Sequence, residues 1–164
     1  MPQGKGRIAS GMLDAGLEGE VLGFSFDGTG LGTDGHMWGA EVMQADYISF
    51  DRLYHFEYMP LPGGDRASKE PWRMGISYLY HCFGDEIYDL KIPLIQHIKK
   101  QDIGNIVSLI QKKINTPLVS SAGRLFDAVA AITGLNYYSS YQAEAPMLLE
   151  SAIDRWQKDN RSWR

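Results

Sequence analysis

The chain has 164 residues, of which 44% are hydrophobic and 22% are charged. This length and balance predict one folded domain with its own core and exclude general disorder. The formal net charge of −4 argues against nucleic acid as the main partner. Because Cys82 is the single cysteine, it forms no internal disulfide, and no apolar run is long enough for a membrane span or a signal peptide. We therefore expect a cytoplasmic protein.

The first third of the chain predicts a short helix followed by strands. Residues 1–6 are polar and glycine-rich and are expected to form a loose N-terminal arm, with a short helix at 8–17. The apolar run at residues 20–26 predicts a buried strand, and further strands are predicted at 38–45 and 53–58. Three successive strands with short connections indicate an antiparallel meander.

Helices are predicted to dominate after residue 64. The spacing of apolar residues places four helices at residues 65–83, 102–114, 121–134 and from about 146 onward. Pro71 must kink the first of these helices or reset its start, and Ser120 or Ser121 can cap the third. The expected fold class is α/β (α+β), with a small, mostly antiparallel sheet and several helices.

A glycine-rich segment, residues 27–35, follows directly on the first predicted strand. Glycines let the backbone turn sharply and approach a ligand, so that exposed N–H groups can receive a phosphate while carboxylates face a cation or a ribose. The nucleotide-contacting candidates here are Asp27, Gly28, Thr29, Gly30, Gly32, Asp34 and Gly35. A glycine-rich hairpin that binds no ligand is the alternative.

The common phosphate and cation motifs do not fit this segment. A Walker loop requires Lys and Ser or Thr after its last glycine, whereas His36 and Met37 follow Gly35. A dinucleotide fingerprint must open a helix, but residues 36–42 resemble a turn or strand. An EF-hand would need a glutamate where Trp38 stands.

Elsewhere, Arg124 and Asp127 lie near the start of a predicted helix. Arg124 can complement an anion while Asp127 accepts hydrogen bonds from ribose hydroxyls; the alternative is an ion pair on a capped surface helix. His36 adjoins the glycine segment and is a candidate phosphate donor. No His-x-x-x-His or Cys-x-x-Cys pair and no nucleophile with a base is evident, so catalytic residues stay unassigned and no metal site is predicted.

Three blocks in fixed order carry a family resemblance. They are the glycine segment with Trp-Gly-Ala-Glu at 38–41, Pro-Leu-Pro-Gly-Gly-Asp at 60–65 with Glu-Pro-Trp-Arg at 70–73, and Ser-Ser-Ala-Gly-Arg-Leu-Phe-Asp-Ala-Val-Ala-Ala at 120–131. With these blocks the chain resembles the hydrogenase-maturation carbamoyltransferases of the HypF type.

The resemblance implies a partial actin/Hsp70-like (ASKHA) nucleotide-binding domain over residues 7–164. The family domain binds ATP-derived carbamoyl-adenylate and passes the carbamoyl group to the C-terminal cysteine of a HypE-type partner protein. By matching position, residues 27–30 would face the phosphate and Asp127 the ribose, with Arg124 and Glu144 nearby. The net charge and the lack of a membrane-span-length apolar run predict no nucleic-acid or membrane partner.

The chain also departs from the family pattern. The family carries a His-His-x-Ala-His motif for iron or zinc just before the segment that matches Ile8, but here residues 3–7 read Gln-Gly-Lys-Gly-Arg. A later Ser-Gly-Gly-Val-Phe block and an aspartate ligand are missing, and Ala143 stands where glycine is usual. We therefore expect an internal fragment that has lost the metal site and is inactive alone. The alternatives are a non-catalytic interaction or nucleotide-binding module that forms a homodimer, and a calcium- or glycan-binding loop protein.

Overall fold

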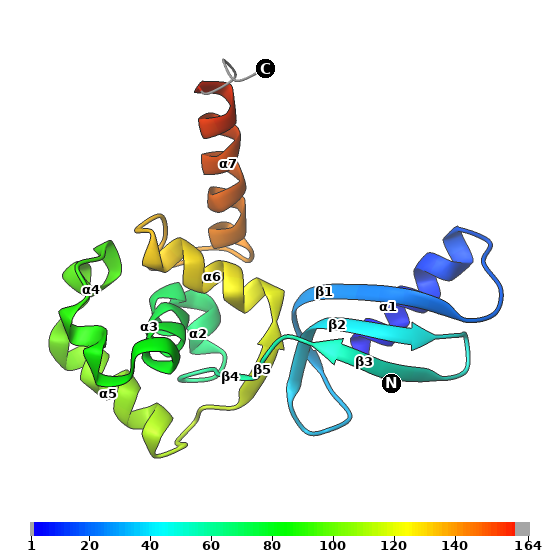
Figure 1. Ribbon diagram of the computed structural model, residues 1–164, viewed down its shortest axis with the longest axis horizontal. Helices are drawn as coiled ribbons and strands as arrows, with labels where there is room; N and C mark the ends of the chain where they lie inside the picture. The colour runs from blue at the N-terminus through cyan, green and yellow to red at the C-terminus, as the bar shows by residue number, and fades with distance from the viewer. Residues whose placement is uncertain (1, 160–164) are drawn as a thin grey trace. The chain divides into compact units, whose positions relative to one another are not determined.

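The computed structural model describes residues 2–159 and divides into two compact units (Figure 1). Unit 1 comprises the chain up to Pro60 together with Pro117–Gly123, and unit 2 comprises Leu61–Thr116 and the chain from Arg124. The sequence led us to expect a single domain over residues 7–164 after a short arm. Met1 of that arm and residues 160–164 of that domain lie outside the described residues.

Unit 1 is a five-stranded sheet with one helix. Its elements are α1 (Gln3–Asp14), β1 (Val21–Leu31), β2 (Met37–Ala45), β3 (Phe50–His55), β4 (Met59–Pro60) and β5 (Leu118–Ser121). The strand order is β1-β2-β5-β4, with β3 also paired to β2. β1, β2 and β3 form the antiparallel meander that the sequence predicts, whereas β5 pairs with β2 in parallel.

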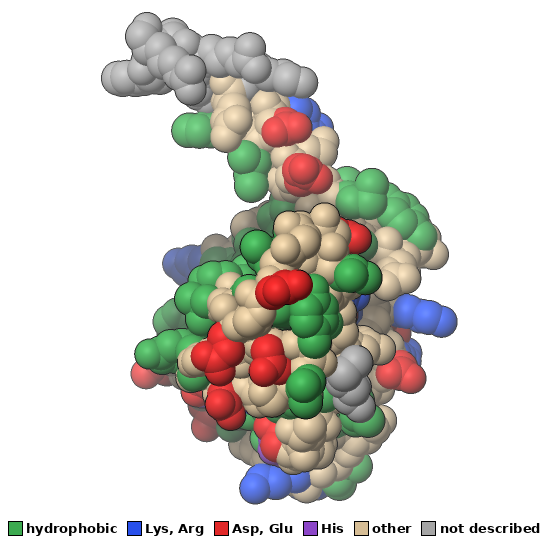
Figure 2. All heavy atoms as spheres, turned by 90° about the vertical axis from the view of Figure 1, so that its right-hand side faces the viewer, with side chains coloured by type: hydrophobic (Ala, Val, Ile, Leu, Met, Phe, Trp, Pro, Cys, Tyr) green, Lys and Arg blue, Asp and Glu red, His purple; other side chains and the backbone are tan. Residues whose placement is uncertain are grey.

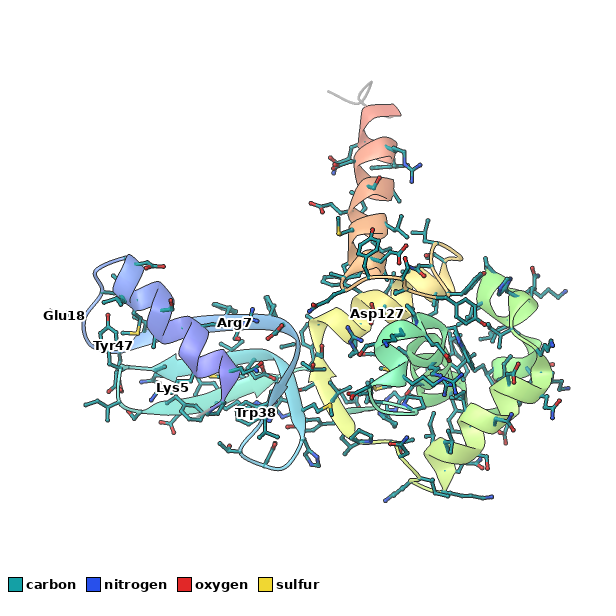
Figure 3. All side chains as sticks on the ribbon, turned by 180° about the vertical axis from the view of Figure 1, so that it is seen from behind. Lys5, Arg7, Glu18, Trp38, Tyr47 and Asp127 are labelled. Carbon is teal, nitrogen blue, oxygen red and sulfur yellow. The ribbon has the colours of Figure 1, made fainter. Side chains whose placement is uncertain are left out.

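Helix α1 covers one face of this sheet. Ile8 and Met12 of α1 pack in a core with Met43, and a Cβ atom at Gly23 would lie 2.5 Å from Cδ1 of Ile8, so the helix needs glycine there to approach β1. The helix begins at Gln3, within the segment expected to be a loose arm. Lys5 is only 4% exposed and donates a hydrogen bond to the carbonyl of Ile48 (Figure 3). These contacts fix residues 3–6 in place.

Strand β1 is not the buried strand that its apolar sequence predicts. Its side chains alternate between the two faces, and α1 covers only the face that carries Ser25. Leu22, Phe24 and Phe26 point to the other face and are between 57% and 62% exposed. Exposed hydrophobic side chains also lie next to a group of carboxylates on the side of the molecule shown in Figure 2.

Unit 2 is helical. Its elements are α2 (Arg66–Lys69), α3 (Pro71–Phe83), the 3-10 helix η1 (Gly84–Asp89), α4 (Pro93–His97), α5 (Lys100–Gln111), most of α6 (Ala122–Ile132) and α7 (Glu144–Asp159). Pro71 occupies the first turn of α3 and so resets the helix start. The core of this unit includes Trp72, Ile76, Leu94 and Ile103.

Ser120 and Ser121 end β5, and Ser121 directly precedes the first residue of α6. Their hydroxyls also bond to other strands of unit 1. On α6 itself, Val129 is exposed while Ala128 and Ala131 are fully buried. Within residues 2–159, no helix combines the length and apolar character that crossing a bilayer requires.

Candidate functional site

The glycine-rich segment forms a β-hairpin between β1 and β2. Phe26 pairs with Ala40 and Gly30 with Trp38, so β1 bulges at residues 27–29, which have no register partner in β2. Beyond the bulge, the amide of Gly32 donates to the carbonyl of His36 at 2.9 Å and closes the turn. The backbone of the segment is therefore a β-hairpin with a bulge that begins at Asp27.

Close packing and turn geometry inside unit 1 require glycine at Gly32 and Gly35 of this segment and at Gly123, which faces Gly28. A Cβ atom at Gly32 would lie 2.2 Å from Nε1 of Trp38, and one at Gly123 would lie 2.8 Å from Cα of Gly28. Gly35 has a φ of 80°, a conformation that favours glycine. Turn geometry and packing thus account for glycines that the sequence alone associated with a ligand.

Asp27 and Gly28 are held in place by β5. Oγ of Ser121 lies 2.9 Å from the carbonyl oxygen of Asp27 and also donates to that of Gly28. The Asp27 carboxylate accepts from the amide of Gly28 at 2.6 Å through Oδ1 and pairs with Arg7 at 2.7 Å through Oδ2. At the start of the bulge, these contacts therefore hold both the backbone carbonyls and the side chain of Asp27 in place.

Asp34 has a separate set of partners. Its Oδ1 accepts from the amide of His36 at 3.1 Å and from Nε1 of Trp38 at 2.9 Å, and its Oδ2 accepts from the hydroxyl of Tyr58. Burial raises the pKa of this carboxyl, but the hydrogen bonds from Tyr58, His36 and Trp38 outweigh it and bring the pKa to about 2. Asp27 and Asp34, both predicted to contact the nucleotide, thus bind different groups.

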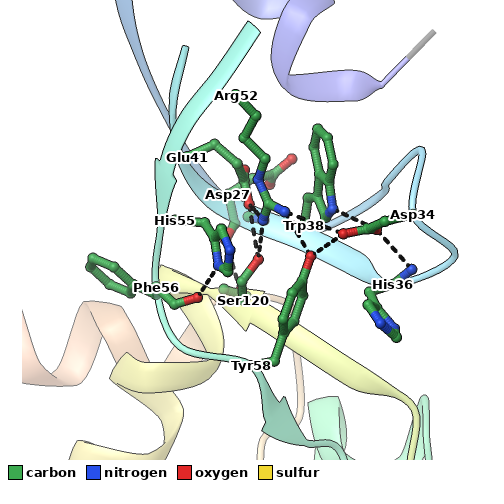
Figure 4. Close-up of polar contacts among 12 residues, drawn as sticks. Asp27, Asp34, His36, Trp38, Glu41, Arg52, His55, Phe56, Tyr58 and Ser120 are labelled. Carbon is green, nitrogen blue, oxygen red and sulfur yellow. Dashed lines mark hydrogen bonds and ion pairs between the residues drawn. The ribbon is translucent and has the colours of Figure 1, made fainter.

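A buried polar network connects the hairpin to β3 and β5 (Figure 4). Arg52 donates to Glu41 at 3.1 Å and to Oγ of Ser120 at 2.9 Å, and its other terminal nitrogen donates to the hydroxyl of Tyr58 at 2.7 Å. Its guanidinium lies 3.9 Å from the ring centroid of Trp38. Because Glu41 is 1% exposed, its charge requires this cation.

Sequence reasoning missed Arg52 and Tyr58. The glutamate of the Trp-Gly-Ala-Glu block was the available signal, since a glutamate in an otherwise apolar strand demands a buried cation. His36, expected as a phosphate donor, packs its ring 4.7 Å from that of Tyr58, and His55 packs at 4.8 Å. Among residues 2–159, no three His, Cys, Asp or Glu side chains form a group that could hold a metal ion.

In unit 2, Arg124 and Asp127 form an ion pair on the first turns of α6, with 2.9 Å between Nη1 and Oδ2. The pair exists as the spacing predicts, but it is not on the surface, since Asp127 is only 3% exposed. Burial raises the pKa of Asp127 to about 6, although the Arg124 charge opposes that rise. Asp127 is thus a buried carboxyl that titrates near neutral pH.

Glu144, the first residue of α7, bonds back to the preceding loop of unit 2. Its Oε2 accepts from the amide of Ser140 at 2.6 Å and from the hydroxyl of the same residue at 2.9 Å. The backbone hydrogen bond from Ser140, followed by that from its hydroxyl, lowers the pKa of Glu144. The candidate residues therefore divide into Asp27–Gly35 in unit 1 and Arg124, Asp127 and Glu144 in unit 2.

Comparison with known proteins gives a consistent family. The family model described as carbamoyltransferase, Kae1-like domain, second subdomain, matches residues 23–164. The chain is 36% identical to carbamoyltransferase HypF2 of Cupriavidus necator over 149 residues, which is 91% of this chain and 18% of that protein. It is 43% identical to carbamoyltransferase HypF of Rhodobacter capsulatus over 134 residues, 81% of this chain and 17% of that protein.

Solved structures agree. A crystal structure of full-length HypF in the phosphate- and nucleotide-bound form matches 92% of this chain with a TM-score of 0.84 and 36% identity, over 23% of its own length. A second match is the crystal structure of HypF from T. kodakarensis, with a TM-score of 0.79 and 35% identity, over 92% of this chain and 20% of that one. The chain thus spans about a fifth of the length of these relatives.

Proposed function

Because the chain belongs to the HypF-type carbamoyltransferase family, we propose that it binds carbamoyl-adenylate and that the bulge at Asp27–Thr29 contacts the phosphate. The adenylate would serve the transfer of a carbamoyl group to the C-terminal cysteine of a HypE-type partner during hydrogenase maturation. Roles for Arg124, Asp127 and Glu144 in binding the nucleoside stay predictions that need their own variants.

The observation that carries this proposal is the bracing of the bulge by Ser121. No cis peptide bond occurs among the described residues, and in a trans peptide the C=O and N–H point in opposite directions. Since Ser121 binds the carbonyl of Gly28, the amide of Thr29 in the same peptide points away from β5. Thr29 also lies in the bulge and has no register partner in β2. An oriented amide of this kind suits a phosphate oxygen.

The transfer itself is a substitution at the carbamoyl carbon. The thiolate sulfur of the partner's cysteine attacks that carbon, the C–S bond forms, and the C–O bond to the phosphate breaks, so that AMP leaves with the electron pair. No residue of this chain is assigned to activate the thiol. We therefore propose that the chain alone binds the adenylate without turning it over.

Calorimetry with a non-hydrolysable carbamoyl-adenylate mimic tests the proposal. We expect saturable binding by the wild-type chain. Ser121→Ala should bind more weakly, because the carbonyls of Asp27 and Gly28 lose their hydrogen bonds from the Ser121 hydroxyl. Ser151→Ala, on the exposed part of α7, is the matched control and should bind as the wild type does. Absence of binding by the wild type would overturn the nucleotide proposal, and transfer to a cysteine-terminated peptide by the chain alone would overturn its inactivity.

A second candidate function is a dimeric interaction module, favoured by the exposed face of the meander. This apolar face, which α1 does not cover, consists of Leu22, Phe24, Phe26, Tyr54 and Phe56, each at least 40% exposed. Phe26 and Phe56 lie next to each other, with ring centroids 6.1 Å apart. Contiguous apolar surface of this kind marks interaction sites. Sedimentation at several concentrations separates the candidates, because a monomer at every concentration contradicts the dimeric module.

A further inference from the structure

Arg7 is the cation that α1 brings to the glycine hairpin. Its guanidinium pairs with the carboxylate of Asp27 at 2.7 Å, and Figure 3 shows it on the helix beside β1. The side chain of Arg7 is 58% exposed and that of Asp27 22%. The other cation of α1, Lys5, is buried against the β2–β3 turn. Arg7 thus combines a fixed position at the start of the bulge with access to solvent.

The residues of α1 do not fit the metal that the family resemblance implies. The resemblance implies that the five positions of the His-His-x-Ala-His pattern correspond to residues 3–7, with Arg7 in place of its last histidine. Guanidinium and ammonium groups have no lone pair for a metal ion, and here the guanidinium occupies the Asp27 carboxylate. A side chain at Gly4 would also meet Met43 Cε at 2.9 Å and Ser25 Oγ at 3.0 Å.

We propose that Arg7 is an anion-contacting residue that takes the place of the metal beside the hairpin, so that phosphate binding by this chain is independent of divalent cations. This inference rests on the proposed binding of an adenylate at the bulge. A guanidinium offers five donors in a planar fork. It can therefore keep one nitrogen on Asp27 while its other donors bind two phosphate oxygens.

The charge of the chain makes this local cation important. The formal net charge is −4, so the protein as a whole does not attract an anion. Asp27 itself would repel a phosphate if its charge were not balanced, and Arg7 provides the balance at 2.7 Å. A lysine at this position would keep the charge but could not hold Asp27 and bind a phosphate with the same planar geometry.

The test is calorimetric titration of the whole chain with AMP, in EDTA and in the presence of Mg²⁺ or Zn²⁺. We expect wild-type affinity to be the same in all three conditions, and Arg7→Ala to bind about ten- to a hundredfold more weakly, the loss typical of a charged hydrogen-bond donor. Arg7→Lys should fall between them. Arg66→Ala removes a similarly exposed, ion-paired arginine in unit 2 and should bind as the wild type does.

The outcomes separate this inference from the proposed function. If Arg7→Ala and a second variant, Arg7→Gln, bind AMP as tightly as the wild type, Arg7 has no such role while nucleotide binding stands. Stoichiometric Zn²⁺ uptake in equilibrium dialysis, or AMP binding that EDTA abolishes, would show that a metal is used. Either result would overturn the proposal that Arg7 takes the place of the metal. If the wild-type chain binds neither AMP nor the carbamoyl-adenylate mimic under any condition, both proposals fail. Melting curves of each variant verify that it is folded.

Discussion

At the scale of single residues, Asp127 is a carboxyl whose pKa is raised by burial in the fold. Burial on α6 disfavours its charged form more than the Arg124 guanidinium stabilises that form, so its pKa rises from 3.8 to about 6. Between about pH 4 and about pH 6 the native chain holds a proton here that the unfolded chain has released. The stability that depends on this proton is therefore lost as the pH rises through that window.

Asp127→Asn should remove this pH dependence. As the pH rises through this window, the contribution of Asp127 to the free energy of unfolding of the wild type should fall by about 1.4 kcal/mol per pH unit. Asparagine does not titrate, so the variant has no such loss. The stability of the variant relative to the wild type should therefore rise by up to about 2 kcal/mol between about pH 4.5 and about pH 7, whatever fixed penalty the loss of the Asp127 charge adds. Urea unfolding at each pH measures this, with the exposed Asp154→Asn as control. Parallel pH profiles for Asp127→Asn and the wild type would contradict it.

Ala143 carries local backbone strain. Its φ of 64° lies in the left-handed region, where a Cβ atom crowds the following carbonyl. This residue stands immediately before α7, and its carbonyl accepts the hydrogen bond from the amide of Met147. Glycine adopts this conformation without strain.

Ala143→Gly should stabilise the chain by about 0.5 to 1 kcal/mol, because relief of left-handed strain exceeds the entropy that glycine adds to the unfolded state. The midpoint of urea unfolding measures the gain. Ala152→Gly, within α7, is the matched control and should lose about 1 kcal/mol, since its backbone is already helical. A loss of similar size at both positions would show that Ala143 is not strained.

At the scale of elements, the guanidinium of Arg52 links three strands of unit 1. It lies on β3, bonds to Glu41 of β2 and Ser120 of β5, and packs on Trp38 at the start of β2. Through Tyr58 the network also reaches Asp34 in the hairpin turn. The shape of the hairpin therefore depends on a planar cation that donates in several directions.

Arg52→Lys should lower the free energy of unfolding by about 1 to 3 kcal/mol, because one ammonium cannot replace the guanidinium at both Glu41 and Tyr58. Arg52→Met should cost about 3 to 5 kcal/mol, since it leaves the buried Glu41 charge without a cation. Urea unfolding of both variants tests the order. Arg66→Lys, at an exposed ion pair, should change stability by less than about 0.5 kcal/mol. Equal effects of Arg52→Lys and Arg66→Lys would contradict the network's role.

The elements that sequence reasoning predicted correctly are those whose causes are local. Pro71 starts α3 because proline suits the first turn of a helix, and the stripe of Ile103 and Ile106 predicts α5. Strand β5 was missed because its four residues are stabilised by pairing with β2, about eighty positions earlier in the chain. For the same reason, the burial of Asp127 and the partners of Arg52 follow from tertiary packing and not from spacing.

At the scale of the whole molecule, the apolar face of unit 1 is an exposed surface that a partner could cover. Phe24 at its centre is 62% exposed and lies opposite Val42 on β2, which pairs with Tyr54 on β3. Burying such a side chain against a partner gains about 1.5 to 3 kcal/mol. If a second copy of the chain covers this face, removing one central aromatic ring should weaken the association strongly.

Phe24→Lys should therefore shift the chain toward the monomer. A charge at the centre of the face loses the apolar contact and must be desolvated on association, so sedimentation equilibrium should give a dimer dissociation constant at least about tenfold higher than that of the wild type. Phe83→Lys, at the end of α3 outside this face, is the matched control and should leave the constant unchanged. Because Phe24 is exposed in the monomer, its replacement should alter the unfolding free energy of the monomer by less than about 0.5 kcal/mol. Identical association of Phe24→Lys and wild type would mean that the dimer, if formed, uses another surface.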